Sequence, residues 1–355
     1  MIERELLRMN AVPVYQNKMF GSAEAARSCP SGDLVLTQNE QSGLVHNAAF
    51  NPALIQYDSS YQNEQVHSSA FRAHIDQVIE LVGRHFEAMS ILEIGCGKGA
   101  FLNLLLAAGH EARGIDPAYE GDSPHIVPRA FEPGLGIRAN AIIMRHVLEH
   151  IPSPVEFLQH VRTANGGVGR IYIEVPCLDW IMQQRAWFDI FYEHVNYFRI
   201  DDFARIFGNV IEAGHLFGGQ YLYAVAELES LRDPAIVNGI SNPVTLPIDF
   251  FARLDRCAAA VRSSTACAIW GAAAKGVMFS HHLQLRGVMP SIAIDINPAN
   301  QGCVLAGTGL PVLPPSEAIA RLGATPDIFV MNSNYLSEIR ALGGAGPNYI
   351  AVDHT

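Results

Sequence analysis

The chain has 355 residues, 49% of them hydrophobic, and a formal net charge of −11 at pH 7. A chain of this length exceeds one ordinary small domain, so we expect at least two domains with buried cores. Nucleic acids and anionic membranes attract clustered Lys and Arg, so the acidic charge and the lack of a basic run in the sequence predict neither as a partner.

The N-terminal residues and the cysteines add expectations about location. Residues 1–8 are rich in charge and contain no apolar core of about 7–15 residues, so we expect no signal peptide. No run of about 18 apolar residues occurs in the sequence, which predicts no membrane span. The six cysteines are scattered without a C-x-x-C pair and indicate reduced thiols of a cytoplasmic protein.

Residues 1–75 show no sustained hydrophobic periodicity, and we expect an irregular N-terminal segment there. Within it, residues 57–65 are polar and aromatic and directly precede an amphipathic helix predicted over residues 74–86. This stretch is either a surface connection or a lid over a ligand pocket.

Residues 91–99 (ILEIGCGKG) are the most informative stretch of the sequence. They predict a strand, a tight glycine turn and the start of a helix, an arrangement that brings backbone amides close to a nucleotide-like ligand. The glycine spacing is G-x-G-x-G, and Glu93 stands two positions before the first glycine. A dinucleotide fingerprint would need a third glycine where Ala100 stands. A NAD-type turn and a purely structural glycine loop are the alternatives.

The next predicted strand, residues 112–116, ends in a carboxylate, Asp116. An ionised carboxylate at that position can accept hydrogen bonds from both hydroxyls of a ribose. Short apolar strands and helices continue to alternate up to residue 227, with further strands predicted at 141–144, 170–175, 210–216 and 220–226. The last two are joined by a Phe-Gly-Gly turn and predict an antiparallel hairpin that closes an otherwise parallel sheet.

A second alternating unit follows a Pro- and Gly-containing linker. Its strands are predicted near residues 266–270, 291–295, 312, 327–331 and 349–353, with helices between them. This pattern predicts a smaller α/β domain with a parallel sheet. The expected domain organisation is therefore an irregular segment and lid (1–75), a first α/β domain (76–230), a linker and helix (231–265) and a second α/β domain (266–355).

The glycine loop and its acids resemble those of class I methyltransferases that use S-adenosylmethionine. Their first motif corresponds to Glu93-x-Gly95-x-Gly97-x-Gly99 and their ribose-binding acid to Asp116. The resemblance implies a Rossmann-like core with a mostly parallel seven-stranded sheet and a terminal antiparallel hairpin, and S-adenosylmethionine as the cofactor. The cofactor contacts that we expect from it are Glu93, Gly95, Gly97, Gly99, Asp116, Arg145 or His146, and Tyr61 and Gln62 of the lid.

The two-part layout is similar to that of sugar-nucleotide C-methyltransferases of deoxysugar biosynthesis, which add a C-terminal Rossmann-like domain to a methyltransferase core. The matching residues are Gly271–Lys275, Asp295-x-Asn297-Pro298, Gln301-Gly302 and Asn334. That family usually carries an N-terminal zinc module with four cysteines, whereas only Cys29 occurs in this region. A structural zinc needs four Cys or His ligands, so we expect no metal and a less specific substrate assignment.

Residues 146–150 (HVLEH) spell an inverted zinc-protease motif, H-x-x-E-H. That motif needs a continuous helix, but here an apolar strand precedes it and Pro152 and Pro154 follow at once. A strand end and loop of a methyltransferase core fits better. In that setting Arg145 or His146 would contact the methionine end of the cofactor, and the alternative is a structural role.

Residues 191–198 (FYEHVNYF) resemble the Tyr-x-Glu-His-x-x-x-Phe stretch of the sugar C-methyltransferases. The resemblance implies His194 as the general base, with Glu193 and Tyr192 assisting, and a His is suited to this because its ordinary pKa is near neutral. The alternative is a His that is merely hydrogen-bonded under a loop. The position of the family's Tyr holds Phe191, which leaves room for O- or N-methylation or for another carbon nucleophile.

The acceptor site is less well indicated. The turn at residues 271–275 is either a phosphate-contacting turn with Lys275 as its charge partner or a structural turn. Asn334 and Trp180 are further candidates for substrate contacts, and Trp180 fits a core position equally well. The sequence thus predicts a methyltransferase acting on a small molecule, by C-methylation or alternatively by O- or N-methylation. A non-catalytic protein that binds S-adenosylmethionine is the other alternative, and no oligomeric state is indicated.

Overall fold

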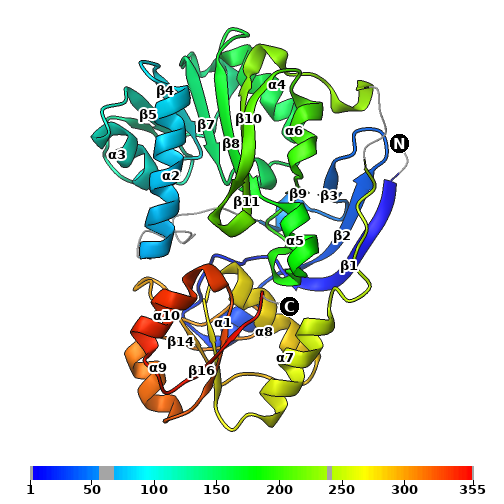
Figure 1. Ribbon diagram of the computed structural model, residues 1–355, viewed down its shortest axis with the longest axis vertical. Coiled ribbons are helices and arrows are strands. Elements are labelled where there is room, and N and C mark those ends of the chain that lie inside the picture. Colours follow the sequence, from blue (N-terminus) through cyan, green and yellow to red (C-terminus); the bar gives the residue numbers. More distant parts are fainter. Residues whose placement is uncertain (1–2, 56–67, 238–241, 354–355) are drawn as a thin grey trace.

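The computed structural model describes residues 3–55, 68–237 and 242–353. These residues form three sheets, which Figure 1 shows as an upper α/β domain, a lower α/β domain and a smaller sheet along one side. None of the helices within the described ranges is both long and apolar enough to cross a bilayer.

The upper domain is built on the seven-stranded sheet that the sequence predicts. Its strand order is β10-β11-β8-β7-β4-β5-β6, and every pair is parallel except β11–β8 and the hairpin β10–β11. The predicted fold class is confirmed. The strands are β4 (Ile91–Ile94), β5 (Ala112–Ile115), β6 (Ile126–Val127), β7 (Ala141–Arg145), β8 (Arg170–Pro176), β10 (Val210–Leu216) and β11 (Tyr221–Glu227).

Helices cover both faces of this sheet because its strands alternate apolar side chains between the two faces. One face packs on α2 and α3 and the other on α4 and α6 (Figure 1). In α2, Phe71, Ile75, Val78 and Val82 recur at helical spacing and are buried, and the Ser68 hydroxyl accepts a hydrogen bond from the Phe71 amide. The helices of this domain are α2 (Ser69–His85), α3 (Ala100–Ala107), α4 (Pro154–Ala164), α5 (Leu178–Gln184) and α6 (Ile200–Ile206).

The lower domain has a five-stranded parallel sheet in the order β14-β13-β12-β15-β16, as expected. Its strands are β12 (Cys267–Trp270), β13 (Ile292–Ile294), β14 (Val312–Leu313), β15 (Asp327–Val330) and β16 (Asn348–Ala351). Its helices are α7 (Ala252–Ser263), α8 (Ala274–Leu285), α9 (Pro315–Leu322) and α10 (Leu336–Gly343).

The N-terminal region is ordered as a sheet, so the expectation of an irregular segment is wrong for its described residues. The strands β1 (Glu3–Pro13), β2 (Ser31–Asn39), β3 (Val45–Asn47) and β9 (Asn196–Tyr197) form an antiparallel sheet. Two register irregularities in the β1–β2 pair break the alternation of buried side chains, which hides the period of the strand from the sequence. Its last strand comes from the proposed catalytic stretch.

The segment of residues 14–29 runs from β1 to the lower domain, and we call it the N-terminal strap. Its short helix α1 (Ala23–Arg27) lies among the elements of the lower domain in Figure 1. Phe20 and Val304 exchange backbone hydrogen bonds of 3.2 and 2.9 Å, and the Gly307 amide donates to the Ala26 carbonyl at 2.8 Å. The strap therefore joins the N-terminal sheet to the C-terminal domain.

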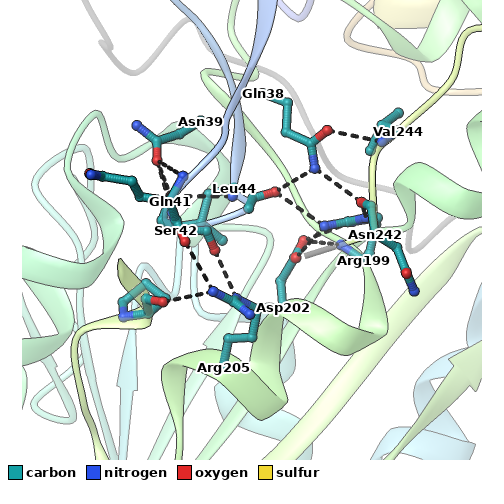
Figure 2. Close-up of polar contacts among 12 residues, drawn as sticks. Gln38, Asn39, Gln41, Ser42, Leu44, Arg199, Asp202, Arg205, Asn242 and Val244 are labelled. Atoms are coloured by element: carbon teal, nitrogen blue, oxygen red, sulfur yellow. Dashed lines mark hydrogen bonds and ion pairs between the residues drawn. The ribbon is translucent and has the colours of Figure 1, made fainter. Parts of the chain in front are cut away.

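Polar contacts also hold the described part of the predicted linker against the N-terminal sheet. Figure 2 shows Gln38 accepting a hydrogen bond from the Val244 amide at 2.9 Å, while its own amide donates to the Asn242 carbonyl at 3.2 Å. The buried Arg199 donates to the same carbonyl and pairs with Asp202 at 2.9 Å. Because Arg199 directly follows the proposed catalytic stretch of residues 191–198, this cluster fixes the end of that stretch.

Candidate active site

A cavity of about 410 Å³ lies between the two α/β domains. Its lining comes from the glycine loop after β4, the proposed catalytic stretch and the carboxyl ends of the strands of the lower sheet. Ligands of open α/β sheets bind at such strand ends. Its polar lining includes Asn17, Glu93, Arg145, His146, Glu149, His150, Asp189, His194, Gln220, Lys275, Asp295, Asn297, Asn332 and Glu338.

The glycine loop forms the upper end of the cavity, and its backbone needs glycine. Gly95 has a φ of 76°, and a Cβ there would lie 2.4 Å from the Val147 side chain. Gly97 has a φ of 55° and lines the cavity, and a Cβ there would meet no atom within 4 Å. The loop therefore leaves room for a ligand at Gly97. The expected contacts Gly95 and Gly97 lie on the cavity wall, whereas Gly99 caps α3 outside it.

Glu93 points into this end of the cavity and is 3% exposed. Within the described part of the chain its Oε2 has no hydrogen-bond partner. Burial raises the pKa of its carboxyl to about 7, although Arg145 opposes the shift. A buried oxygen without a partner fits a ligand that donates hydrogen bonds, as an ammonium group does.

Asp116 follows β5 and holds the glycine loop from the side. Its Oδ2 accepts from the Gly97 amide at 2.8 Å, and its Oδ1 accepts from the Ala118 amide at 2.8 Å. It lies beside Gly97 but is not among the cavity-lining residues. The lone pairs that these two bonds do not use remain for further donors.

Near the loop, the carboxylate of Glu174 contacts four side chains and forms a buried charge network with them. Its carboxylate lies 2.9 Å from His74 Nε2, 3.2 Å from two guanidinium nitrogens of Arg145 and 3.1 Å from His146 Nε2, and it accepts from the Tyr172 hydroxyl at 2.8 Å. Burial alone would raise its pKa, but Arg145 and the histidines hold it well below the usual range. The network fixes Arg145 and His146 at the cavity wall.

His146 has an unusual backbone and a raised pKa. Its φ of 53° is left-handed, a strained conformation that recurs at functional sites. Burial opposes its protonation, but the carboxylates of Glu149 and Glu174, 3.4 and 3.1 Å from its ring nitrogens, outweigh burial and raise its pKa to about 9. His146 therefore carries a positive charge at neutral pH, beside the glycine loop.

The proposed base His194 lines the cavity and is 8% exposed. Its ring packs on Phe191 with centroids 3.9 Å apart and on His150 with centroids 5.0 Å apart. Burial, followed by His150, His146 and Lys275, holds the pKa of His194 well below its usual value. A His in this environment is neutral at pH 7 and can accept a proton.

Glu193 and Tyr192 point away from the cavity, contrary to the catalytic roles expected for them. Glu193 is fully buried, and its carboxylate accepts from the Gln16 amide at 3.0 Å and from Asn17 Nδ2 at 3.2 Å. The Tyr192 hydroxyl accepts from the Asn51 amide at 2.9 Å. Neither residue lines the cavity. Phe191 and His194 line it instead, on either side of the turn at residues 192–193.

Lys275 reaches the cavity from the first turn of α8 and pairs with Asp189 of the upper domain at 3.0 Å. Its ammonium lies 5.4 Å from the Trp180 ring centroid and 5.2 Å from that of Phe188. Trp180 therefore lies behind Lys275 rather than on the cavity wall. Burial raises the pKa of Asp189, and Lys275 opposes that shift. No motif in the sequence indicated Asp189 as a residue of the site.

Asp295 at the tip of β13 repeats the arrangement of Asp116. Its Oδ2 accepts from the Ala272 amide of the preceding turn at 2.9 Å, and its Oδ1 accepts from the Asn297 amide at 2.8 Å. It lines the lower end of the cavity. The sequence did offer a signal, since Asp295 stands one strand after a glycine turn, as Asp116 does.

The two domains are bonded to each other around the cavity. Asn332 donates to Gln220 at 2.8 Å, and the Ser68 hydroxyl donates to Glu338 at 2.7 Å. Asn334, expected to bind substrate, instead donates to the Phe217 carbonyl at 2.9 Å and lies off the cavity wall. Tyr61 and Gln62 lie outside the described residues.

Three side chains in the described part of the chain could share a metal ion: Glu149, His150 and His194, whose ligand atoms lie within 4.8 Å of one another. This number falls short of the four ligands of a structural zinc site. We therefore expect elemental analysis of the purified protein to find far less than one zinc per chain. Stoichiometric zinc that disappears in His150→Ala or His146→Ala, but remains in the exposed control His160→Ala, would contradict this prediction.

Comparison with known proteins agrees with this architecture. Residues 66–210 match a methyltransferase domain family, and residues 252–342 match the C-methyltransferase C-terminal domain. The chain is 23% identical over 305 residues to the C-methyltransferase NovU of Streptomyces niveus, covering 76% of this chain and 72% of NovU. It is 34% identical over 79 residues to an uncharacterised methyltransferase of Bacillus cytotoxicus, covering 22% of this chain and 36% of that protein.

Among solved structures, a SAM-dependent methyltransferase of Archaeoglobus fulgidus is similar with a TM-score of 0.35 and 18% identity, covering 45% of this chain and all of that one. The two family matches fall on the two α/β domains, and the first includes the glycine loop, Asp116 and His194. The chain thus carries a methyltransferase domain followed by a C-methyltransferase C-terminal domain, and these matches support a class I S-adenosylmethionine-dependent methyltransferase.

Proposed function

We propose that this methyltransferase methylates a carbon atom of a sugar nucleotide, with His194 as the general base. The observation that carries the proposal is the position of His194. Buried and neutral, it lines the same cavity as the glycine loop of the upper domain and the strand ends of the lower domain. A second ligand held by the lower domain would reach the cofactor beside this imidazole.

The residues at the upper end fit S-adenosylmethionine, which supplies an electrophilic methyl group when bound. Glu93 offers a buried acceptor to an ammonium group, Gly97 leaves space beside the loop, and Asp116 offers carboxylate lone pairs to ribose hydroxyls. His146 and Arg145 offer positive charge to the carboxylate at the methionine end of the cofactor.

The lower end of the cavity suits a nucleotide. Asp295 is arranged as Asp116 is, at the tip of the strand after a glycine turn, where an acid can accept from sugar hydroxyls. The first turn of α8 and the Lys275 ammonium lie beside it on the same wall, and both attract phosphate. A nucleoside diphosphate bound there would direct its sugar toward His194.

In this proposal His194 accepts the proton from a carbon next to a ketone of the sugar. The electron pair of the broken C–H bond passes into the enolate, whose carbon would then bond to the methyl group while the bond from that methyl to the cofactor's sulfur breaks and leaves its electron pair on sulfur. Phe191 holds the imidazole by packing against it at a tilt of 38°, and Glu193 holds the loop, since its carbonyl accepts from His150 Nδ1 at 2.8 Å. A positioned base of this kind lowers the barrier without any change in cofactor binding.

The decisive experiment offers nucleoside diphosphate keto-deoxysugars to the enzyme together with S-adenosylmethionine carrying a ¹³C-labelled methyl group. We expect a product one methylene unit heavier, whose labelled methyl is bonded to carbon in its ¹³C spectrum. A labelled methyl bonded to oxygen or nitrogen would contradict C-methylation and show that the enzyme is an O- or N-methyltransferase. No transfer to any sugar nucleotide would overturn the proposed acceptor class.

Asp116→Ala should weaken S-adenosylmethionine binding about ten- to a hundredfold. The carboxylate offers charge-assisted hydrogen bonds, worth about 1.5–3 kcal/mol, and its loss also releases the Gly97 amide. Calorimetric titration of the folded variant measures the effect, with the exposed Asp122→Ala as the control. Unchanged affinity would remove Asp116 from the cofactor site, and a wild-type chain that prefers NAD would contradict the cofactor assignment.

A further inference from the structure

The base His194 has one ring nitrogen that is enclosed by the protein. Its Nδ1 is buried and has no hydrogen-bond partner in the described part of the chain. A nitrogen without exposed surface cannot reach an acceptor molecule, so Nε2 is the atom that would take the proton. A neutral imidazole carries one proton, and Nε2 can accept another only if the first stands on Nδ1. The base therefore needs a hydrogen-bond acceptor beside Nδ1.

The carboxylate that precedes His194 in the sequence does not supply this acceptor. Glu193 directs its oxygens to the N-terminal strap, where they accept from the Gln16 amide at 3.0 Å and from Asn17 Nδ2 at 3.2 Å. The acceptor has to come from another element that packs against the His194 loop.

The turn after β7 packs against that loop on both sides of the base. The Val195 amide donates to the Glu149 carbonyl at 2.7 Å. His150 Nδ1 donates to the Glu193 carbonyl at 2.8 Å. These two bonds fix the backbone of Glu149 next to the base. A carboxylate oxygen of Glu149 and a ring nitrogen of His194 consequently lie within 4.8 Å of each other.

The Glu149 carboxylate has room for a hydrogen-bond donor. It lines the cavity and is 1% exposed. Its Oε1 lies 3.4 Å from His146 Nδ1, but within the described ranges neither oxygen accepts a hydrogen bond of normal geometry. A buried carboxylate without hydrogen bonds is costly, so its position calls for a donor. The separation from His194 suits one bridging water, because two hydrogen bonds of about 2.8 Å at a water oxygen span roughly 4.5 Å.

The charge of Glu149 also suits a base that becomes positive. After it has taken a proton, His194 is an imidazolium. That charge is disfavoured by burial and then by three neighbours, which are His150, His146 and Lys275. A carboxylate within 4.8 Å offsets part of this repulsion, as the aspartate of a Ser-His-Asp triad does for its histidine.

We propose that Glu149 is the positioning residue of the base, which accepts the hydrogen bond of Nδ1–H of His194 and so leaves Nε2 to take the proton of the acceptor. Glu149 keeps the imidazole in one tautomer and offsets its charge, but it does not contact the acceptor. The role expected for Glu193 thus passes to a carboxylate from a different element. This inference rests on the proposed function, because it takes His194 as the base.

The first test needs no acceptor and uses the enzyme with S-adenosylhomocysteine, its histidine rings labelled with ¹⁵N. The ¹⁵N chemical shifts of a histidine ring report which nitrogen is protonated, and the signals of His194 are those absent from His194→Ala. At neutral pH we expect the Nδ1-protonated tautomer in the wild type and in the control Glu156→Gln, an exposed substitution on α4. Glu149→Gln should give a mixture of tautomers, because an amide can donate to the ring as well as accept from it.

The second test measures methyl transfer from S-adenosylmethionine to a nucleoside diphosphate keto-deoxysugar, and deuterium incorporation next to the ketone in D₂O with S-adenosylhomocysteine present. Glu149→Gln should lower kcat and the exchange rate about ten- to a hundredfold, the contribution of one charge-assisted hydrogen bond. The KM for the sugar nucleotide and the Kd for S-adenosylmethionine should stay within about twofold. Glu149→Asp keeps a carboxylate and should retain more of kcat than Glu149→Gln, and thermal denaturation checks that both variants are folded.

The outcomes separate this inference from the proposed function. If the tautomer of His194 depends on Glu149 but the wild type transfers no methyl to any sugar nucleotide, the acceptor class is wrong and the positioning role stands. A tautomer unchanged in Glu149→Gln, or a wild type protonated at Nε2, would overturn the positioning role and leave C-methylation to its own assay. A constant kcat with a raised Kd for S-adenosylmethionine would also overturn it and reduce Glu149 to a counter-ion of His146.

Discussion

Turnover in His194→Ala should fall by about 10²–10⁴, the usual effect of removing a positioned base. The affinity for S-adenosylmethionine should stay nearly constant, because the glycine loop and Asp116 lie elsewhere in the cavity. Steady-state kinetics and calorimetry check the two parts separately. His160→Ala, an exposed substitution on α4, serves as the control. Glu193→Gln should lower turnover less than His194→Ala does.

The pH profile adds an independent check on the same residue. Because the surroundings of His194 hold its pKa well below the ordinary value of 6.5, the neutral, proton-accepting form persists as the pH drops past 6.5. The loss of rate due to protonation of His194 should therefore begin only at more acidic pH. A rate that halves near pH 6.5, or near-full activity of His194→Ala, would contradict its role as a base. Full activity would favour an acceptor that is already nucleophilic, as in N- or O-methylation.

Glu174→Ala should destabilise the protein by about 3–5 kcal/mol, the cost of leaving buried charges uncompensated. Glu174 is fully buried, and its removal would leave Arg145 and protonated His146 without their shared counter-ion. Equilibrium unfolding in urea measures the change. Glu212→Ala is a useful contrast, since the partly exposed pairs of Glu212 with Arg84 and His85 should be worth about 1 kcal/mol or less. Equal losses in the two variants would contradict the importance of the buried network.

The sign of the pH dependence follows from the lowered pKa of Glu174. A carboxylate that ionises more readily in the folded state than in the unfolded state stabilises the fold at pH values above its unfolded pKa of about 4.5. This contribution should diminish as the pH falls below that value. The wild type should therefore lose stability on acidification more steeply than Glu174→Ala does.

The sequence predicts the α/β domains well because their signals are local. The strand, glycine turn and helix at residues 91–105 and the strand that ends before Asp116 all fall where the pattern places them. Both domains alternate short apolar strands with helices, and this alternation determines a parallel sheet. The N-terminal sheet was missed because its strand β9, Asn196–Tyr197, lies far along the chain and has only two residues.

The site was also predicted only in part, because some of its residues carry local sequence signals and others depend on contacts between distant parts of the chain. Glu93, Gly97, Arg145, His146, His194 and Lys275 carry local signals and do line the cavity. The orientation of Tyr192 depends on Gly32 and Asn51, and the contacts of Trp180 and Asn334 depend on how the two domains meet. Asn17 reaches the cavity through tertiary contacts of the strap alone. The sequence close to each of these residues does not indicate which distant residues it contacts in the fold.

The double attachment of the N-terminal strap has a consequence for how the protein is made. Chains are synthesised from the N-terminus, and domains tend to fold as they emerge. Phe20 and Ala26 find their backbone partners only at Val304 and Gly307, far later in the sequence. Until these residues have been synthesised the strap cannot close, and the cavity lacks the lining that Asn17 supplies. The nascent enzyme therefore stays incomplete until both α/β domains have emerged, and a chain truncated before Val304 would be left with an unpaired strap.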